Sequence, residues 1–89
     1  MARVQVYSTP SCPFCVRAKR LLAARGIPFD EIDVGEDEEL RAELVHRSGR
    51  RTVPQIFIDG RSIGGYEELV ALDARAELAP LVEDGGDGV

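Results

Sequence analysis

Two cysteines separated by two residues are the most reactive feature of this 89-residue chain, in the run Cys12-Pro13-Phe14-Cys15. A disulfide between them closes a very short loop and removes little entropy from the unfolded chain. A structural disulfide framework normally uses more cysteines at wider spacing. The pair therefore indicates thiol–disulfide exchange, in which a thiolate attacks the sulfur of a disulfide.

The two thiols are expected to differ in role because they start a predicted helix. Pro13 suits the first helical position, where no backbone N–H is needed, and this places Cys12 directly before the helix. Free backbone N–H groups and the helix dipole favour an anion there, so we expect Cys12 to be the exposed nucleophile with a lowered pKa. Arg17 and Lys19 add positive charge nearby. We expect Cys15, one turn deeper, to be buried and to resolve the mixed disulfide.

Two other interpretations of the cysteine pair stay open. The thiols can be buried structural side chains, or they can be half of a zinc site. The only other soft metal ligand in the sequence is His46, and there is no second Cys-x-x-Cys. We therefore expect no bound metal and assign His46 no role.

The elements before and after the motif are expected to hold it at one end of a sheet. Residues 3–7 alternate polar and apolar side chains, which indicates a strand, and residues 8–11 form a turn cluster. The helix that follows has an apolar face at helical spacing. That face consists of Phe14, Ala18, Leu21 and Leu22. Gly26 ends this helix near Arg25.

The middle of the chain predicts a second strand and a second helix. Residues 27–34 have the composition of a strand, and the acidic residues 33–38 favour the start of a helix. Its apolar stripe consists of Leu40, Leu44 and Val45. The helix is expected to end at residues 47–49.

The last third of the chain predicts a hairpin followed by one helix. Residues 55–58 and 61–63 are short strands around Asp59-Gly60, a strong signal for a two-residue turn. Gly64-Gly65 breaks the chain. The final helix is expected to bury Leu69, Leu72 and Ala76, with Pro80 as its kink or its end.

The predicted order is β-α-β-α-β-β-α, which is an α/β chain. The strand–helix–strand unit is expected to have parallel strands, and the hairpin adds an antiparallel pair. We therefore expect a four-stranded mixed sheet flanked by helices. A chain of this length holds a single domain, expected over residues 1–84, with the glycine-rich residues 85–89 as a flexible tail.

Composition excludes several classes of partner. The formal net charge of −5 argues against a nucleic-acid binder. No apolar run approaches the ~18 residues of a membrane span, and no signal stretch precedes the first strand, so we expect no membrane contact and a cytoplasmic location. Residues 1–29 and 46–63 are nevertheless rich in arginine and lysine. If these two blocks meet in space, a positive field surrounds the thiols.

Together these motifs resemble the glutaredoxin family, specifically the small bacterial dithiol glutaredoxins, from about Val4 to Val82. The resemblance rests on four segments, which are Cys12-Pro13-Phe14-Cys15 after a strand ending in Tyr7, Arg47-Ser48-Gly49 leading into Thr52-Val53-Pro54-Gln55-Ile56-Phe57-Ile58, Ile63-Gly64-Gly65 and Leu72-Asp73-Ala74-Arg75. It implies a thioredoxin-like fold. It also implies a cis peptide bond before Pro54, in a loop that faces the cysteines.

The resemblance further implies a glutathione site beside the cysteines. Its lining residues are expected to be Phe14, Thr52, Val53, Pro54, Gly65, Tyr66 and Glu67. Three departures from the family pattern bear on affinity. Thr9 stands where many members have a lysine, with Arg51 as the replacement cation, and Glu67-Glu68 replaces the usual aspartate or serine. Tyr66 stands where family members vary, and it either stacks over the ligand or caps the core.

By this resemblance the chain is a glutathione-dependent disulfide oxidoreductase and a monomer. Its partners are glutathione, disulfide-containing proteins and glutathionylated proteins. One alternative is a redoxin reduced by thioredoxin reductase, although the chain has no Trp before its cysteines, as thioredoxins usually do. Another is a carrier of a [2Fe–2S] cluster held between two subunits by Cys12 and glutathione, which Pro13 disfavours by stiffening the loop.

Overall fold

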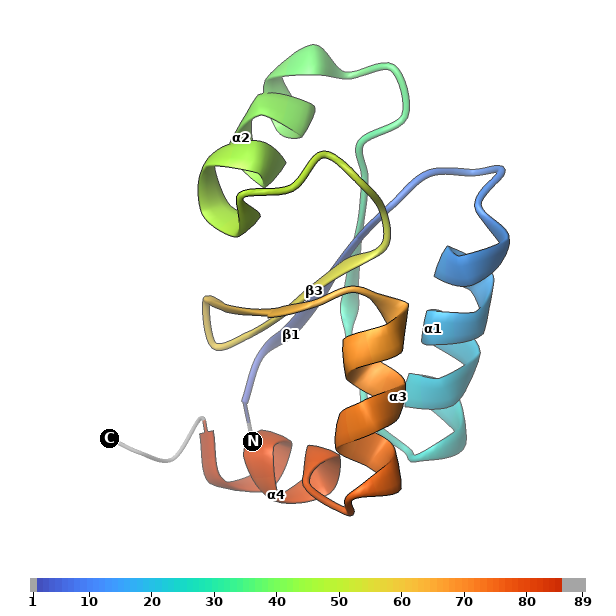
Figure 1. The fold of residues 1–89 in the computed structure, drawn as a ribbon, viewed down its shortest axis with the longest axis vertical. Helices are drawn as coiled ribbons and strands as arrows, with labels where there is room; N and C mark the ends of the chain where they lie inside the picture. The colour runs from blue at the N-terminus through green and yellow to red at the C-terminus, as the bar shows by residue number, and fades with distance from the viewer. Residues whose placement is uncertain (1, 86–89) are drawn as a thin grey trace.

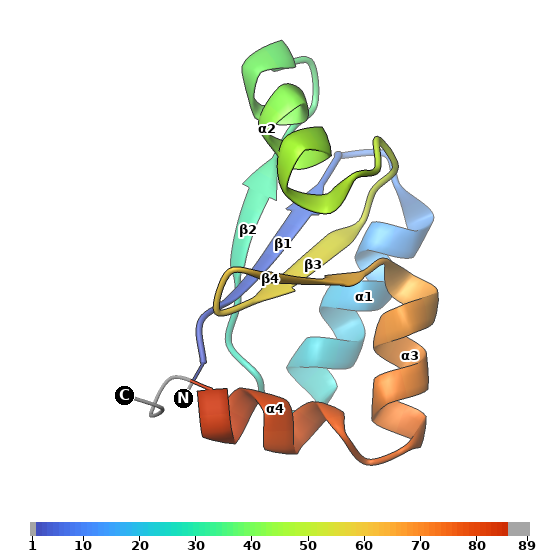
Figure 2. The ribbon, with the colours of Figure 1, turned by 60° about the vertical axis from the view of Figure 1, so that its left-hand side comes forward.

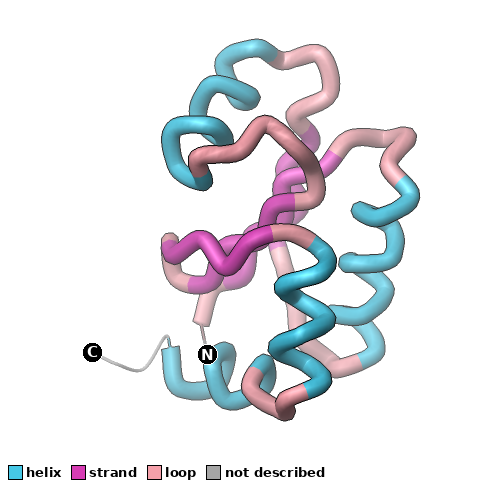
Figure 3. Tube along the Cα trace, viewed as in Figure 1, coloured by secondary structure: helices cyan, strands magenta, loops and turns pink. Residues whose placement is uncertain are grey.

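The chain alternates strands and helices in the computed structural model, which describes residues 2–85 (Figures 1 and 3). The elements in order are β1 (Val4–Ser8), α1 (Pro13–Ala24), β2 (Asp30–Asp33), α2 (Glu38–Ser48), β3 (Gln55–Ile58), β4 (Arg61–Gly64), α3 (Tyr66–Ala74) and α4 (Leu78–Gly85). The predicted order β-α-β-α-β-β-α is confirmed, with one additional helix at the end.

The four strands form one mixed sheet in the order β2-β1-β3-β4. β1 runs parallel to β2 and antiparallel to β3, and β4 returns antiparallel to β3. Tyr7 lies opposite Ile32 on one side and opposite Gln55 on the other. β1 therefore ends where β3 begins, which places the cysteine loop and the loop before β3 at the same edge of the sheet.

Helices cover both faces of this sheet (Figure 2). On one face α1, α3 and α4 pack around a cluster that includes Val6, Leu22 and Ile56, all fully buried. On the other face α2 packs Leu44 against Tyr7, Phe57 and Val34. The alternation of β1 and β3 side chains between two apolar layers fixes their register, because a one-residue slip would exchange the faces.

Both ends of the two longest helices follow the sequence signals. The sulfur of Cys12 caps α1, and Gly26 follows the helix with φ of 68°. The Asp37 carboxylate caps α2 by accepting a hydrogen bond from the Leu40 N–H at 3.0 Å. Gly49 ends α2 in the left-handed conformation that glycine adopts most readily.

Two predicted boundaries are wrong. The last helix is two helices, because Ala76 adopts a left-handed φ of 56° between α3 and α4 instead of lying on an apolar face. Pro80 lies in the first turn of α4, where its missing N–H costs nothing, so it neither kinks nor ends a helix. The second strand is shorter than predicted, since Pro28 precedes it in irregular chain. Of the tail predicted over residues 85–89, Gly85 ends α4 and residues 86–89 lie outside the described residues.

Arg47 lies in the interface between α2 and the sheet rather than near the thiols. Its guanidinium carbon is 4.2 Å from the centre of the Phe57 ring, and its Nη1 donates a 2.6 Å hydrogen bond to the Tyr7 hydroxyl. The Tyr7 hydroxyl in turn lies 3.1 Å from Glu43 Oε1. Burial is the main reason that the pKa of Tyr7 is raised. One of the arginines of the second basic block therefore stabilises the fold.

Candidate active site

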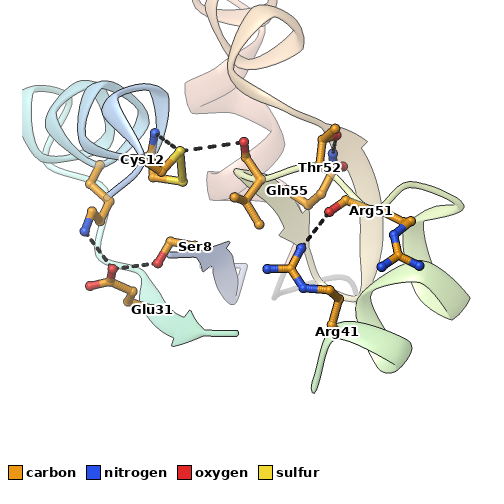
Figure 4. Close-up of a disulfide and its surroundings, with 10 residues drawn as sticks. Ser8, Cys12, Glu31, Arg41, Arg51, Thr52 and Gln55 are labelled. Atoms are coloured by element: carbon orange, nitrogen blue, oxygen red, sulfur yellow. Dashed lines mark hydrogen bonds and ion pairs between the residues drawn. A yellow bond between two sulfur atoms is a disulfide. The ribbon is translucent and has the colours of Figure 1, made fainter. Parts of the chain in front are cut away.

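Cys12 and Cys15 form a disulfide at the N-terminal end of α1 (Figure 4). Cys15 is fully buried, whereas Cys12 is half-buried, which is the difference in access that their positions predict. The backbone N–H of Cys15 donates a hydrogen bond to Cys12 Sγ at 3.1 Å. The helix start therefore presents a donor to the more accessible sulfur.

The loop before β3 faces the same sulfur. The Val53–Pro54 peptide bond is cis, as the sequence resemblance implies. The carbonyl oxygen of Val53 lies 3.7 Å from Cys12 Sγ. Residues 41 positions apart in the sequence thus meet at the reactive centre, and both come from the edge of the sheet where β1 ends and β3 begins.

The two contacts of Cys12 Sγ favour different protonation states. The Cys15 N–H stabilises a thiolate, whereas the Val53 carbonyl accepts a hydrogen bond only from a thiol. The N–H contact is the shorter by 3.7 − 3.1 = 0.6 Å, and a hydrogen bond to an ionised acceptor is the stronger kind. The local balance therefore favours the thiolate once the disulfide is reduced.

The cations expected to assist Cys12 have other partners. Lys19 Nζ lies 2.6 Å from Glu31 Oε2, which also accepts a 2.7 Å hydrogen bond from the Ser8 hydroxyl. The hydrogen bonds from Lys19 and Ser8 lower the pKa of Glu31, and the bond from Lys19 has the larger effect. The guanidinium carbon of Arg17 lies 5.2 Å from the centre of the Phe14 ring. We therefore expect the helix N-terminus to contribute more positive potential at the sulfur than either of these cations.

A cleft of about 200 Å³ adjoins the cysteines between the loop before β3 and the start of α3. It gathers all seven residues that the sequence resemblance places at a glutathione site, namely Phe14, Thr52, Val53, Pro54, Gly65, Tyr66 and Glu67. Phe14 and Tyr66 close one end, with ring centres 5.8 Å apart. A larger cleft of about 800 Å³ lies between β4 and α4 and holds none of these residues.

Three residues of the small cleft were not predicted as site residues, and they are Arg50, Gln55 and Glu68. Glu68 Oε1 accepts a 2.6 Å hydrogen bond from the Gly65 N–H and lies 3.1 Å from Arg50 Nη1. The Gly65 N–H is the largest cause of the lowered pKa of Glu68. Gly65 carries no side chain that could cap α3, so Glu68 supplies that cap from inside the helix.

Gln55 lines the cleft, and the oxygen of its side-chain amide has no hydrogen-bond partner among the described residues. Its Nε2 donates to the Thr52 hydroxyl at 3.2 Å, while its Oε1 is buried. Its position directly after Pro54 is the only sequence signal that could have singled it out. Arg51, expected to replace the lysine absent at Thr9, turns its side chain away from the disulfide (Figure 4).

Comparison with known proteins agrees with this geometry. The family model described as glutaredoxin matches residues 4–63. Glutaredoxin 3 of Escherichia coli (strain K12) is 49% identical over 83 residues, which cover 93% of this chain and all of that protein. This chain belongs to the glutaredoxin family. As a glutaredoxin with a Cys12/Cys15 dithiol, it is a thiol–disulfide oxidoreductase with a thioredoxin-like fold.

Solved glutaredoxins have the same fold. The solution structure of glutaredoxin from Brucella melitensis is 48% identical, has a TM-score of 0.86, and is matched over 96% of this chain and 92% of that one. A crystal structure of the buckwheat glutaredoxin–glutathione complex is 28% identical with a TM-score of 0.87, over 96% of this chain and 80% of that one.

Within residues 2–85 of this glutaredoxin, no helix has the length and apolarity needed to cross a bilayer. In the same residues, no three His, Cys, Asp or Glu side chains are grouped so that they could hold a metal ion.

Proposed function

We propose that this glutaredoxin reduces protein disulfides and glutathione mixed disulfides, with glutathione as the reductant. The observation that carries the proposal is the cleft beside Cys12, where the loop over Thr52 to Pro54 meets the start of α3. A related chain, the buckwheat glutaredoxin, forms a complex with glutathione. The cleft has both an aromatic wall and backbone polar groups, which suit a short peptide.

The two sulfurs divide the reaction between them. The Cys12 thiolate attacks one sulfur of the substrate disulfide, forms a mixed disulfide and expels the other sulfur as a thiolate. The Cys15 thiolate then attacks Cys12 Sγ, which releases the second substrate thiolate and leaves the Cys12–Cys15 disulfide. The structure shows that oxidised state. Two glutathione molecules return the two electrons and become one molecule of glutathione disulfide.

Glutathione is expected to lie in the cleft with its cysteine sulfur toward Cys12. Thr52, Val53 and Pro54 line one side, and Gly65 with Tyr66 lines the other. Phe14 and Glu67 complete the set that we assign to binding. We further propose that residues 1–84 are the functional unit and that the protein works as a monomer in the cytoplasm, where glutathione keeps dithiols reduced.

Coupled assays test this function directly. NADPH oxidation is measured with a small glutathione mixed disulfide, once with glutathione and glutathione reductase, and once with thioredoxin reductase alone. We expect turnover only in the first assay. Turnover only in the second would show that the protein is a thioredoxin-reductase-dependent redoxin. The C15S variant should keep activity on the glutathione mixed disulfide and lose it on protein disulfides, while C12S should lose both.

A further inference from the structure

The exposed surface of α1 and α3 beside Cys12 has an unusual composition. Three of the four large apolar side chains exposed in the described structure lie on these two helices, which are Phe14 at 52%, Val16 at 38% and Val70 at 39% exposure. The two helices run side by side from the same end of the molecule (Figure 1). Phe14 touches Tyr66 at one end of the pair, and Arg25 binds Asp73 at the other, at 2.7 Å.

Two residues of α1, Val16 and Arg20, follow the nucleophile at helical spacing. The Val16 N–H donates to the Cys12 carbonyl at 3.1 Å, so Val16 lies one turn beyond Cys12. Arg20 lies one further turn along the same side of α1 and is exposed. Val70 lies one turn after Tyr66 on α3. Phe14, Val16, Arg17, Arg20, Tyr66 and Val70 are called the α1–α3 face below.

The charge on this face is positive and uncompensated. α1 contains no acidic residue, and neither Arg17 nor Arg20 forms an ion pair with any side chain of the described part of the chain. Of the three acids of α3, Glu68 is engaged by Arg50 and Asp73 by Arg25, while Glu67 lines the cleft on the other surface. A protein with a formal net charge of −5 therefore presents two arginines within about two turns of its reactive sulfur that form no ion pair in the described part of the chain; the only partner of Arg17 there is the uncharged Phe14 ring.

We propose that the α1–α3 face is the docking surface for protein substrates and that it selects disulfides flanked by an apolar side chain and by acidic residues. This inference rests on the proposed function, in which Cys12 forms a mixed disulfide with the substrate protein. An apolar side chain next to the substrate cysteine covers Phe14, on the flank of α1 toward α3, where Val70 is also exposed. Val16, two positions after Phe14, lies on the other flank of α1 and meets a different part of the substrate. Together these contacts exclude water from the exchanging sulfurs. Acidic residues pair with Arg17 and Arg20 and draw the substrate in.

Small substrates are expected to contact only Phe14 and Tyr66 of this face, and not its arginines or valines. Glutathione occupies the cleft on the other side of Phe14, lined by Thr52 and Gly65. Charge on the α1–α3 face should therefore change the kinetics of protein and peptide disulfides and leave those of a small glutathione mixed disulfide unchanged. This separation distinguishes a docking surface from a part of the catalytic site.

Two peptides of equal length test the proposal with the full chain. Each carries one internal disulfide with Leu beside the reactive cysteine, and the flanking residues are two Glu in one peptide and two Lys in the other. In the glutathione-coupled assay at low ionic strength, we expect kcat/KM to be about tenfold higher for the acidic peptide. Raising the salt to about 1 M, where the Debye length is ~3 Å, should bring the two values together.

Charge reversal at Arg20 tests the face, and charge reversal at Arg61 is the matched control. R20E should reduce the preference for the acidic peptide to about twofold or less. R61E changes the net charge equally on β4, away from the cysteines, and should leave the preference unchanged. Both variants should keep full activity on the small mixed disulfide.

Equal kcat/KM values for the two peptides with the unmodified protein, alongside normal turnover of the small disulfide, would overturn the docking surface and leave the proposed function standing. An equal response to R20E and R61E would overturn it as well. Loss of turnover for every substrate would overturn both proposals.

Discussion

The Cys15 N–H donates a 3.1 Å hydrogen bond to Cys12 Sγ, so the sulfur of the attacking cysteine caps the helix that holds the resolving cysteine. The same spacing that brings the two sulfurs into one disulfide also supplies the donor that stabilises a thiolate. Cys12 consequently gains its reactivity from the backbone, and the nearby Lys19 is left to bind Glu31.

We predict that the Cys12 thiol has a pKa below the ~8.5 of a free cysteine. The measurement is the ultraviolet absorbance of the thiolate in the C15S variant, where Cys12 is the only cysteine. In C12S the remaining thiol, Cys15, is buried and should titrate at higher pH than Cys12 does. A Cys12 pKa at or above ~8.5 would contradict the role of the helix N-terminus.

R47A should lower the free energy of unfolding by about 1–3 kcal/mol, because it removes the stacking on Phe57 and the hydrogen bond to Tyr7. R47K restores the charge without the planar guanidinium and should recover only part of the loss. Urea unfolding measures both variants. R61A, at an exposed site, should stay within about 0.5 kcal/mol of the unmodified protein. A similar effect of R47A and R61A would refute the stabilising role of Arg47.

Glu68 should make stability depend on pH. Its pKa is lowered in the folded state from an ordinary value of 4.5, so its contribution is present above that pH and is lost as the pH falls through the folded pKa. E68Q should therefore destabilise the protein at pH 7, by about 1 kcal/mol or less because the carboxylate is partly exposed, and the difference should shrink below pH 4.5.

Thermal unfolding followed by circular dichroism at several pH values measures this difference. E67Q removes a neighbouring carboxylate with no cap to lose and serves as the control. If the difference in stability between E68Q and the unmodified protein were the same at pH 7 and below pH 4.5, the charge of Glu68 would not contribute to capping α3.

G64A should be more destabilising than G60A. Both glycines have positive φ, 106° and 80°, which costs an alanine about 1–2 kcal/mol. At Gly64 an added Cβ would also lie 2.7 Å from Glu68 Cγ, whereas at Gly60 it would meet open space. In an E68A background, which already lacks the Glu68 cap, G64A should cost no more in urea unfolding than G60A does. Equal losses for G64A and G60A would show that Glu68 does not crowd this position.

Much of the fold follows from local patterns in the sequence. The alternation in residues 3–7, Pro13, the Gly26 stop and the Asp59-Gly60 turn each encode an element through backbone geometry or side-chain period, and the structure has each of them. The break at Ala76 has no such signal, because alanine favours a helix. Only the packing of α4 against the sheet determines that turn.

The candidate site divides in a similar way. The resemblance to glutaredoxins predicts the seven residues around the cleft, because each lies in or beside one of the motifs that carry the resemblance. Gln55 is missed because its side chain has no distinctive pattern, and Arg50 and Glu68 are missed because their contact joins residues distant in sequence. Arg50 meets Glu68 across 18 positions, and no spacing rule within one element describes that contact.

The contact between Phe14 and Tyr66 gives the protein an optical probe of its own. The chain has no Trp and two Tyr, and Tyr7 is buried beneath α2, so changes in tyrosine emission on binding originate at Tyr66. Its ring lies 5.8 Å from Phe14, at the boundary between the cleft and the α1–α3 face. Binding of a ligand to the cleft or to the α1–α3 face can therefore be followed by the tyrosine fluorescence of the unlabelled protein, with no fluorophore added and no residue replaced.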